Sequence, residues 1–268
     1  MPFTPAHVAA ALPLRRLRLV WSALIIGTIA PDLEYFVRLS PDDGYGHTLA
    51  GSLLLSLPLA ILTLWLFHSF VKAPLIELLP DGIQRRLVNH HGEFLFRGAA
   101  RFTWIVASIL VGMTTHLLWD SFTHQNTWLY RNWHVLRKPI NGPIFGTVPI
   151  YKVLQHGSTI VGLGALLIWL LLWYRNAEVS TLPEQEIRPR RKLLILVVVT
   201  TSALFGAAIR AIAAIGTSSN HLVAKRFVGL FVVTSISIMW WEFVLYGFSR
   251  TRRRRTSQIP GFARDDNY

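Results

Sequence analysis

Long apolar stretches separated by short polar segments run along the whole chain. A transmembrane helix needs about 20 mostly apolar residues to cross the hydrocarbon core of a bilayer. The pattern therefore predicts an all-α, polytopic helical membrane protein with about five transmembrane helices. The five stretches that meet or approach this length are Leu49–Val71, Phe102–Trp119, Gly157–Tyr174, Leu193–Ile209 and Phe227–Tyr246.

A sixth apolar stretch, Leu19–Ala30, is too short to span a bilayer alone. We expect it to form a short N-terminal re-entrant or interfacial helix, or one half of a longer helix. We also expect residues 1–175 to form a membrane domain that carries the functional site. Residues 176–268 then add two further transmembrane helices and a basic cytoplasmic tail, within one integral unit.

Lysine and arginine in the loops predict the orientation, because cytoplasmic loops of membrane proteins are enriched in these residues. Arginines crowd the C-terminal tail after residue 249, and further basic residues lie in the loops 72–101 and 175–192. We therefore expect these segments on the cytoplasmic side. The opposite, outer face then receives residues 1–48, 120–156 and 216–225.

Composition supports the membrane assignment and limits the chemistry. Of the 268 residues only 15% are charged, against about 25% in soluble domains. A net charge of +13 would suggest nucleic acid for a soluble protein, but here the arginines flank apolar segments. We therefore expect the lipid bilayer as partner and no nucleic acid. The absence of cysteine excludes disulfides and thiolate ligands, so any metal must be held by histidine and carboxylate side chains.

The stretch HLLWDSFTH places His116, Asp120 and His124 four residues apart at the end of an apolar run. Each step of four residues turns a helix by about 40° and rises about 6 Å, so the three side chains should form one stripe. Neighbours in such a stripe can meet on one ion, and all three can serve two ions if the carboxylate bridges them. The alternative is a buried His–Asp hydrogen-bond network that only joins helices.

Further ionisable residues fall on the same predicted face: His7, Asp32, His47 and His156. Ionisable groups at membrane depth are costly and are normally functional or paired. Together with the stripe they predict a site for a divalent metal.

Three basic residues on this face, Arg38, Arg131 and Lys152, suit an anionic substrate, since cations near a metal can help to hold a phosphate. They suit lipid headgroups equally well. The segment 141–152 is rich in glycine and proline and forms either a lid over the site or an ordinary loop.

Five motifs occur along the chain in this order: MPFTPAH, ALIIGTIAPDLEYF, GHTLAGSLLLSLPL, THLLWDSFTH and PIYKVLQHGSTIVG. Together they resemble an uncharacterised bacterial integral membrane family, the domain of unknown function 4184, and this resemblance implies the bacterial inner membrane. It covers about residues 1–175, and the last two spans are matched only by hydropathy. Residue 8 is valine where family members tend to have proline.

The order of the histidines and aspartates is also distantly similar to the zinc-dependent phospholipase C and P1 nuclease superfamily, and to membrane-bound metal-dependent hydrolases. This resemblance implies two or three zinc ions, with Asp120 as the bridge and Asp32 as both ligand and candidate general base. Position 160 is isoleucine where the superfamily has its last glutamate ligand, and the chain begins with MPFT in place of the processed tryptophan. The implied ligands are His7, Asp32, His47, His116, Asp120, His124 and His156.

Two functions follow from these observations. The first is a membrane-embedded hydrolase of a phosphoester, with Asp32 and Asp120 as catalytic residues. Because the site should face the headgroup layer, a phospholipid or a lipid-linked phosphate is the expected substrate. The second is a non-enzymatic protein that binds metal or scaffolds a partner. A transporter is disfavoured, because the polar groups cluster at one end of the spans and do not follow them through the membrane.

Overall fold

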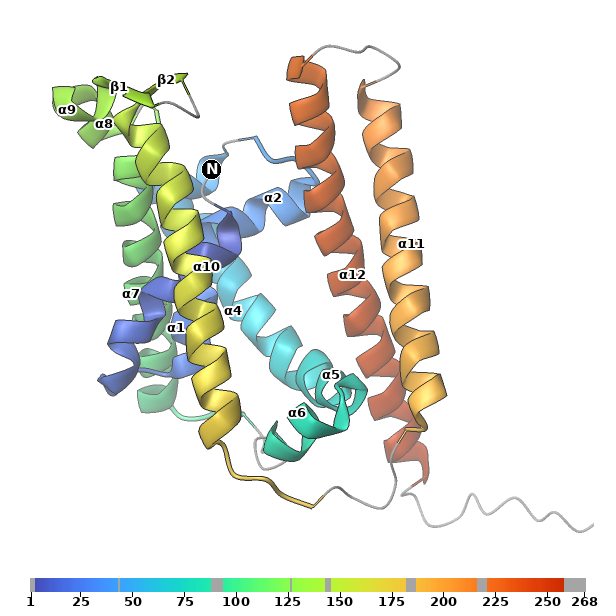
Figure 1. Ribbon diagram of the computed structural model, residues 1–268. Coiled ribbons are helices and arrows are strands. Elements are labelled where there is room, and N and C mark those ends of the chain that lie inside the picture. Colours follow the sequence, from blue (N-terminus) through green and yellow to red (C-terminus); the bar gives the residue numbers. More distant parts are fainter. Residues whose placement is uncertain are drawn as a thin grey trace, which may run out of the picture. The chain divides into compact units, whose positions relative to one another are not determined.

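The fold was analysed on a computed structural model, which describes residues 3–42, 44–87, 94–125, 127–142, 146–181, 187–215 and 221–257 (Figure 1). The chain forms two compact units. The first contains Met1–Tyr35, Asp43–Leu64 and Leu95–Ala177, and the second contains Phe36–Asp42, Trp65–Phe94 and Glu178–Tyr268. The predicted functional division at residue 175 stays a prediction.

Five helices are long and apolar enough to cross a membrane, which confirms the predicted all-α polytopic architecture. Each extends beyond its apolar stretch, because hydropathy marks the part inside the hydrocarbon layer while the backbone hydrogen bonds continue into the polar interface. The candidate spans are Leu49–Leu78, Ala99–Asn132, Ile150–Asn176, Pro189–Ile215 and Val223–Arg252.

The first unit is built on two long helices, α7 (Ala99–Thr123) and α10 (Ile150–Asn176). The apolar N-terminal stretch forms α1 (Trp21–Ile29), which packs along α7. Nine residues of α-helix rise about 14 Å, less than half of the hydrocarbon core, so α1 does not span alone. Before it, the 3-10 helix η1 (Thr4–Arg16) packs against both α1 and α10.

Short helical turns connect α1 to the first span. They are η2 (Ala30–Asp32), α2 (Leu33–Arg38) and η3 (Tyr45–His47). The span itself is one continuous helix with two π-helical turns. Its segments are α3 (Leu49–Gly51), η4 (Ser52–Ser56), α4 (Leu57–Leu66), η5 (Phe67–Val71) and α5 (Lys72–Leu78).

Between α7 and α10 the chain forms a small cap, which Figure 1 shows at the end of α7 and the start of α10. The cap contains α8 (Trp128–Asn132), α9 (His134–Arg137) and the antiparallel strands β1 (Pro139–Gly142) and β2 (Gly146–Pro149). These strands occupy part of the segment 141–152, of which residues 143–145 lie outside the described chain. Its role as a lid stays a prediction.

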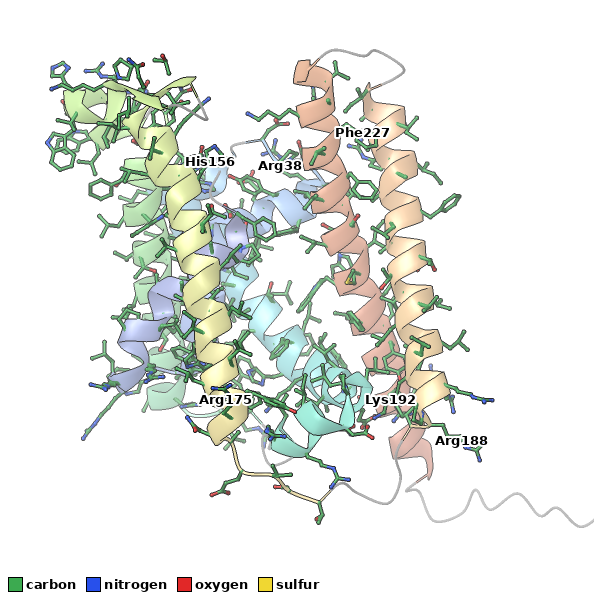
Figure 2. All side chains as sticks on the ribbon, viewed as in Figure 1. Arg38, His156, Arg175, Arg188, Lys192 and Phe227 are labelled. Atoms are coloured by element: carbon green, nitrogen blue, oxygen red, sulfur yellow. The ribbon has the colours of Figure 1, made fainter. Side chains whose placement is uncertain are left out.

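The second unit contains α6 (Asp81–Leu87) and the long hairpin of α11 (Pro189–Ile215) and α12 (His221–Ser257). Small residues line the closely packed face of α11, where Ala203, Ala207 and Ala211 are fully buried. The Nζ atom of Lys192, labelled in Figure 2, lies 2.9 Å from Oδ1 of Asp81 and ties α11 to α6.

Candidate metal centre

Six of the seven predicted ligands meet in the first unit, although they come from four separate segments. His7 lies in η1, Asp32 ends η2, His47 ends η3, and α7 contributes His116 and Asp120. The sixth is His124, which directly follows α7. Two groups of three have ligand atoms close enough to share an ion: His7, His116 and Asp120, and Asp32, His47 and His116.

Asp120 lies at the centre, and each of its carboxylate oxygens faces a different pair of histidines. Its Oδ2 lies 3.1 Å from Nε2 of His116 and 3.6 Å from Nε2 of His47. Its Oδ1 lies 3.2 Å from Nδ1 of His124 and 3.4 Å from Nε2 of His7. A carboxylate held in this way has the arrangement needed to bridge two ions.

Asp32 lies near the same two histidines as Oδ2 of Asp120, namely His47 and His116. Its Oδ1 lies 3.2 Å from Nε2 of His47 and 3.6 Å from Nε2 of His116. The four atoms Asp32 Oδ1, His47 Nε2, His116 Nε2 and Asp120 Oδ2 therefore form a ring with neighbour distances of 3.1 to 3.6 Å. Ligands about 2.1 Å from a zinc ion stand about 3.4 Å apart, and the ligand atoms of Asp32, His47 and His116 are close enough to one another to share an ion.

The orientation of His116 is fixed by α1. Its Nδ1 lies 2.7 Å from the carbonyl oxygen of Thr28, and because a carbonyl only accepts, Nδ1 carries the proton. The lone pair of Nε2 is consequently directed at the two carboxylates. A hydrogen bond that fixes the tautomer in this way is typical of metal-bound histidine. The ring of His7 stacks on that of His116 with centroids 3.9 Å apart.

Three polar atoms inside the cluster support a metal more than a purely structural network. Within the described part of the chain, Asp32 Oδ1, His116 Nε2 and Asp120 Oδ1 are buried without a hydrogen-bond partner. Leaving buried polar atoms unpaired is costly, and all three are atoms that would bind an ion. The residues present therefore fit a divalent metal.

Electrostatics of the N-terminal ligands agree with this fit. Burial lowers the pKa of His7 to about 4, so its ring is neutral and available as a ligand at neutral pH. Burial would raise the pKa of Asp32, but contacts with His47, His116 and Thr4 outweigh it and hold the pKa below its usual value. Burial likewise opposes protonation of His47, yet the carboxylates of Asp120 and Asp32 raise its pKa to about 10. The metal-free cluster thus keeps a proton on His47.

The prediction that His116, Asp120 and His124 all lie on one helix is wrong for His124. α7 ends at Thr123, and His124 has an extended backbone with φ −116° and ψ 149°. Its amide still donates to the carbonyl oxygen of Asp120 at 2.9 Å, which keeps the residue beside the last turn of the helix. The side chain therefore reaches Asp120 from the helix end and not from the next turn.

His156, the seventh predicted ligand, belongs to neither group of three. It lies on α10 with an exposed side chain, as Figure 2 shows. Ile160, one turn further along α10, is 73% exposed. The structure therefore does not bring His156 into the cluster.

The predicted phosphate-binding residues also lie outside the cluster. Arg131 in α8 and Lys152 in α10 are exposed side chains of the first unit. Arg38 ends α2 and belongs to the second unit. Their role in holding a substrate stays a prediction.

Several supporting residues were missed from the sequence. The hydroxyl of Thr4 donates to Oδ2 of Asp32 at 2.6 Å, and the hydroxyl of Tyr35 lies 3.5 Å from Nδ1 of His47. Glu34 is buried and accepts the amide of Gly46, the residue before His47. Glu34 was detectable in principle, since it is a second acidic residue in the apolar stretch APDLEYF.

Comparisons with known proteins give one result. No curated protein and no solved structure matches the chain. A family model described as a domain of unknown function, DUF4184, matches residues 1–248. The match extends beyond the 175 residues expected from the motifs and includes the last two spans. The chain therefore belongs to the DUF4184 family.

Proposed function

We propose that this chain is a membrane-embedded, metal-dependent hydrolase that acts on a phosphoester, with a phospholipid or a lipid-linked phosphate as substrate. The observation that carries the proposal is the position of Asp120, whose two oxygens face different pairs of histidines. A network that only joined helices would satisfy its buried polar atoms with hydrogen bonds. Within the described chain, three atoms of this cluster form none and face only other ligand atoms, at 3.1 to 3.6 Å.

The ligands divide into two sets around Asp120. Asp32, His47 and His116 would hold one ion, and Asp120 with His7 would hold a second, with His124 beside Oδ1 of Asp120. A second ion with so few protein ligands would keep a position open for water, as catalytic zinc sites do. We propose zinc as the metal.

The chemistry follows from the donor set. Zinc bound there would lower the pKa of a bound water to about 7. It would also place positive charge beside the oxygen atoms of the phosphate. Asp32 is the candidate general base. The hydroxyl of Thr4 donates to its Oδ2, so Oδ1 is the oxygen directed into the cluster, where it would act as a ligand or accept a proton from water.

Exposure of the ligands supports an amphiphilic substrate. His116 and Asp32 are almost fully buried, whereas the side chains of His47 and His124 are 20% and 17% exposed and mark the open side. Strongly exposed apolar residues follow both in the sequence: Leu49 comes two residues after His47, and Trp128 four residues after His124. A phosphate at the metals with an acyl chain on this surface fits both features. Arg131 and Lys152 would neutralise the headgroup.

The proposed location follows the charge of the loops. We propose that the cluster faces the outer side of a bacterial inner membrane and that the C-terminus is cytoplasmic, since the tail carries the densest set of arginines. The cluster lies at the end of α7 that leads into the cap, which agrees with a site at the level of the headgroups.

The decisive experiment is to purify the protein in detergent and determine bound metal by mass spectrometry, before and after zinc or manganese supplementation. His116→Ala and Asp120→Ala should lose the metal, and His134→Ala, an exposed histidine of α9, should keep it. A wild-type protein that holds no metal after supplementation removes the basis of the proposal. Bound metal without hydrolysis of phosphodiesters, phospholipids or lipid-linked phosphates would favour the non-enzymatic alternative.

A further inference from the structure

His47 lies in less regular secondary structure than His7 and His116. His7 lies within η1, and His116 lies within α7 and is fixed by Thr28. His47, by contrast, ends the single turn η3, and its side chain is 20% exposed. Its position therefore depends on what holds the loop before it.

Glu34 holds that loop by its backbone. The carboxylate is buried, with the residue only 7% exposed, and its Oε2 accepts the amide hydrogen of Gly46 at 2.6 Å. The carbonyl oxygen of Gly46 accepts the hydroxyl of Ser52 at 2.9 Å. Side chains thus fix both the amide and the carbonyl group of Gly46, the residue before His47. The amide bond is the stronger kind, because its acceptor is a carboxylate.

The loop also fits closely against the segment that carries Asp32. A Cβ on Gly46 would stand 2.8 Å from the carbonyl oxygen of Pro31, and one on Gly44 would collide with the Glu34 carboxyl group. Pro31 immediately precedes Asp32, and Glu34 follows it by two residues. The contact therefore couples the backbone of one proposed ligand to the backbone of another.

We propose that Glu34 is a positioning residue for the metal centre, which sets the approach of His47 to Asp32 through Gly46. The inference rests on the proposed function, because it assumes that His47 and Asp32 share an ion. Groups that orient metal ligands typically change metal affinity by about 10- to 100-fold when they are removed, and Glu34 would orient His47 indirectly, through the backbone of Gly46.

The test measures cobalt binding by competition with a chelating dye, together with the visible spectrum of bound cobalt, in the full-length protein. Glu34→Ala should weaken binding of one metal equivalent by about 10- to 100-fold and alter the spectrum of that ion. Glu34→Gln should restore the affinity to within a few-fold of wild type, because the amide oxygen can still accept from Gly46. Glu77→Ala is the matched control: it removes a partly buried carboxylate and its 2.5 Å pair with Arg250 in the second unit, and should leave cobalt binding unchanged.

A double-mutant cycle separates positioning from general damage to the fold. If Glu34 acts through His47, Glu34→Ala should cause little further loss of affinity in a His47→Ala background. Additive losses, or an unchanged affinity in Glu34→Ala alone, would overturn the inference while leaving the metal centre intact. A wild-type protein that binds no cobalt would overturn the metal centre itself, and the inference with it.

Discussion

The Nδ1 atom of His116 lies 2.7 Å from the carbonyl oxygen of Thr28, so the last turn of α1 orients the central histidine of α7. The approach is possible because α1 and α7 meet through glycine. A Cβ on Gly112 would stand 2.7 Å from the carbonyl carbon of Gly27. The short helix, which is too short to span a membrane alone, thus brings the carbonyl group of Thr28 to the candidate metal centre.

Gly27→Ala should damage both the packing and the site. Its Cβ would stand 2.9 Å from Cα of Ile109, and closer still to the carbonyl oxygen of that residue. Overpacking of this kind costs about 1–3 kcal/mol, and a shift of α1 would move the neighbouring Thr28 carbonyl away from His116. We expect a lower melting temperature in detergent and weaker zinc binding.

The control for this change is Gly164→Ala on α10, where a Cβ would meet nothing within 4 Å. That variant should melt and bind zinc as the wild type does. Equal behaviour of the two variants would mean that the α1–α7 contact does not support the site.

Much of the architecture could be predicted, because the bilayer imposes a simple length and polarity rule on each span. His116 and Asp120 were identified as partners for a similar reason: a spacing of four residues on one helix determines their proximity. His7, Asp32 and His47 come close to these two residues only in the tertiary structure. The sequence indicated this proximity only because all five residues fall on the same predicted face of the membrane and because their order resembles that of known metal-dependent hydrolases.

The features that were not predicted depend on close contacts between segments distant in sequence. The local sequence does not indicate that Gly27 and Gly112 pack against each other. It also does not indicate that Gly46 donates its amide hydrogen to Glu34 and accepts the hydroxyl of Ser52. The end of α7 before His124 was missed for another reason. The polar residues after Thr123 do not interrupt the i, i+4 spacing, so the pattern alone continues the helix.

Asp120→Asn should separate the two halves of the proposed centre. An asparagine has one accepting oxygen and an NH2 group that only donates, so it can offer a ligand atom to only one of two ions. If the wild type binds two ions, we expect this variant to bind at most one, as measured by metal content after dialysis. Asp81→Asn, which alters the carboxylate paired with Lys192 in the second unit, should bind as many ions as the wild type. Full occupancy in Asp120→Asn would contradict a bridging role.

Zinc binding should weaken as the pH falls. The pKa of His47 is raised to about 10 by the neighbouring carboxylates, so this ring is protonated at neutral pH and must lose its proton to bind an ion. His7, with its pKa lowered to about 4, competes with protons only in acid. Each proton displaced changes the apparent affinity roughly tenfold per pH unit, so affinity should rise with pH through neutrality.

Proton release gives a direct measurement of this effect. Titration of the metal-free protein with zinc in weak buffer, followed with a pH indicator, should release at least one proton per protein near pH 7. His47→Ala should release about one proton fewer, since the group that carries the proton is gone. Zinc binding without any release would show that His47 is already neutral.

The orientation can be tested with single cysteines, because the native chain contains none. Lys138→Cys, in the cap between α9 and β1, and Arg191→Cys, at the start of α11, both replace exposed residues. The charge of the loops predicts that a membrane-impermeant maleimide labels position 138 in intact cells, and position 191 only after the membrane is opened. Labelling of both from the same side would overturn this map. The reverse pattern would place the open side of the cluster, next to His47 and His124, in the cytoplasm, where its substrate would have to be a lipid of the inner leaflet.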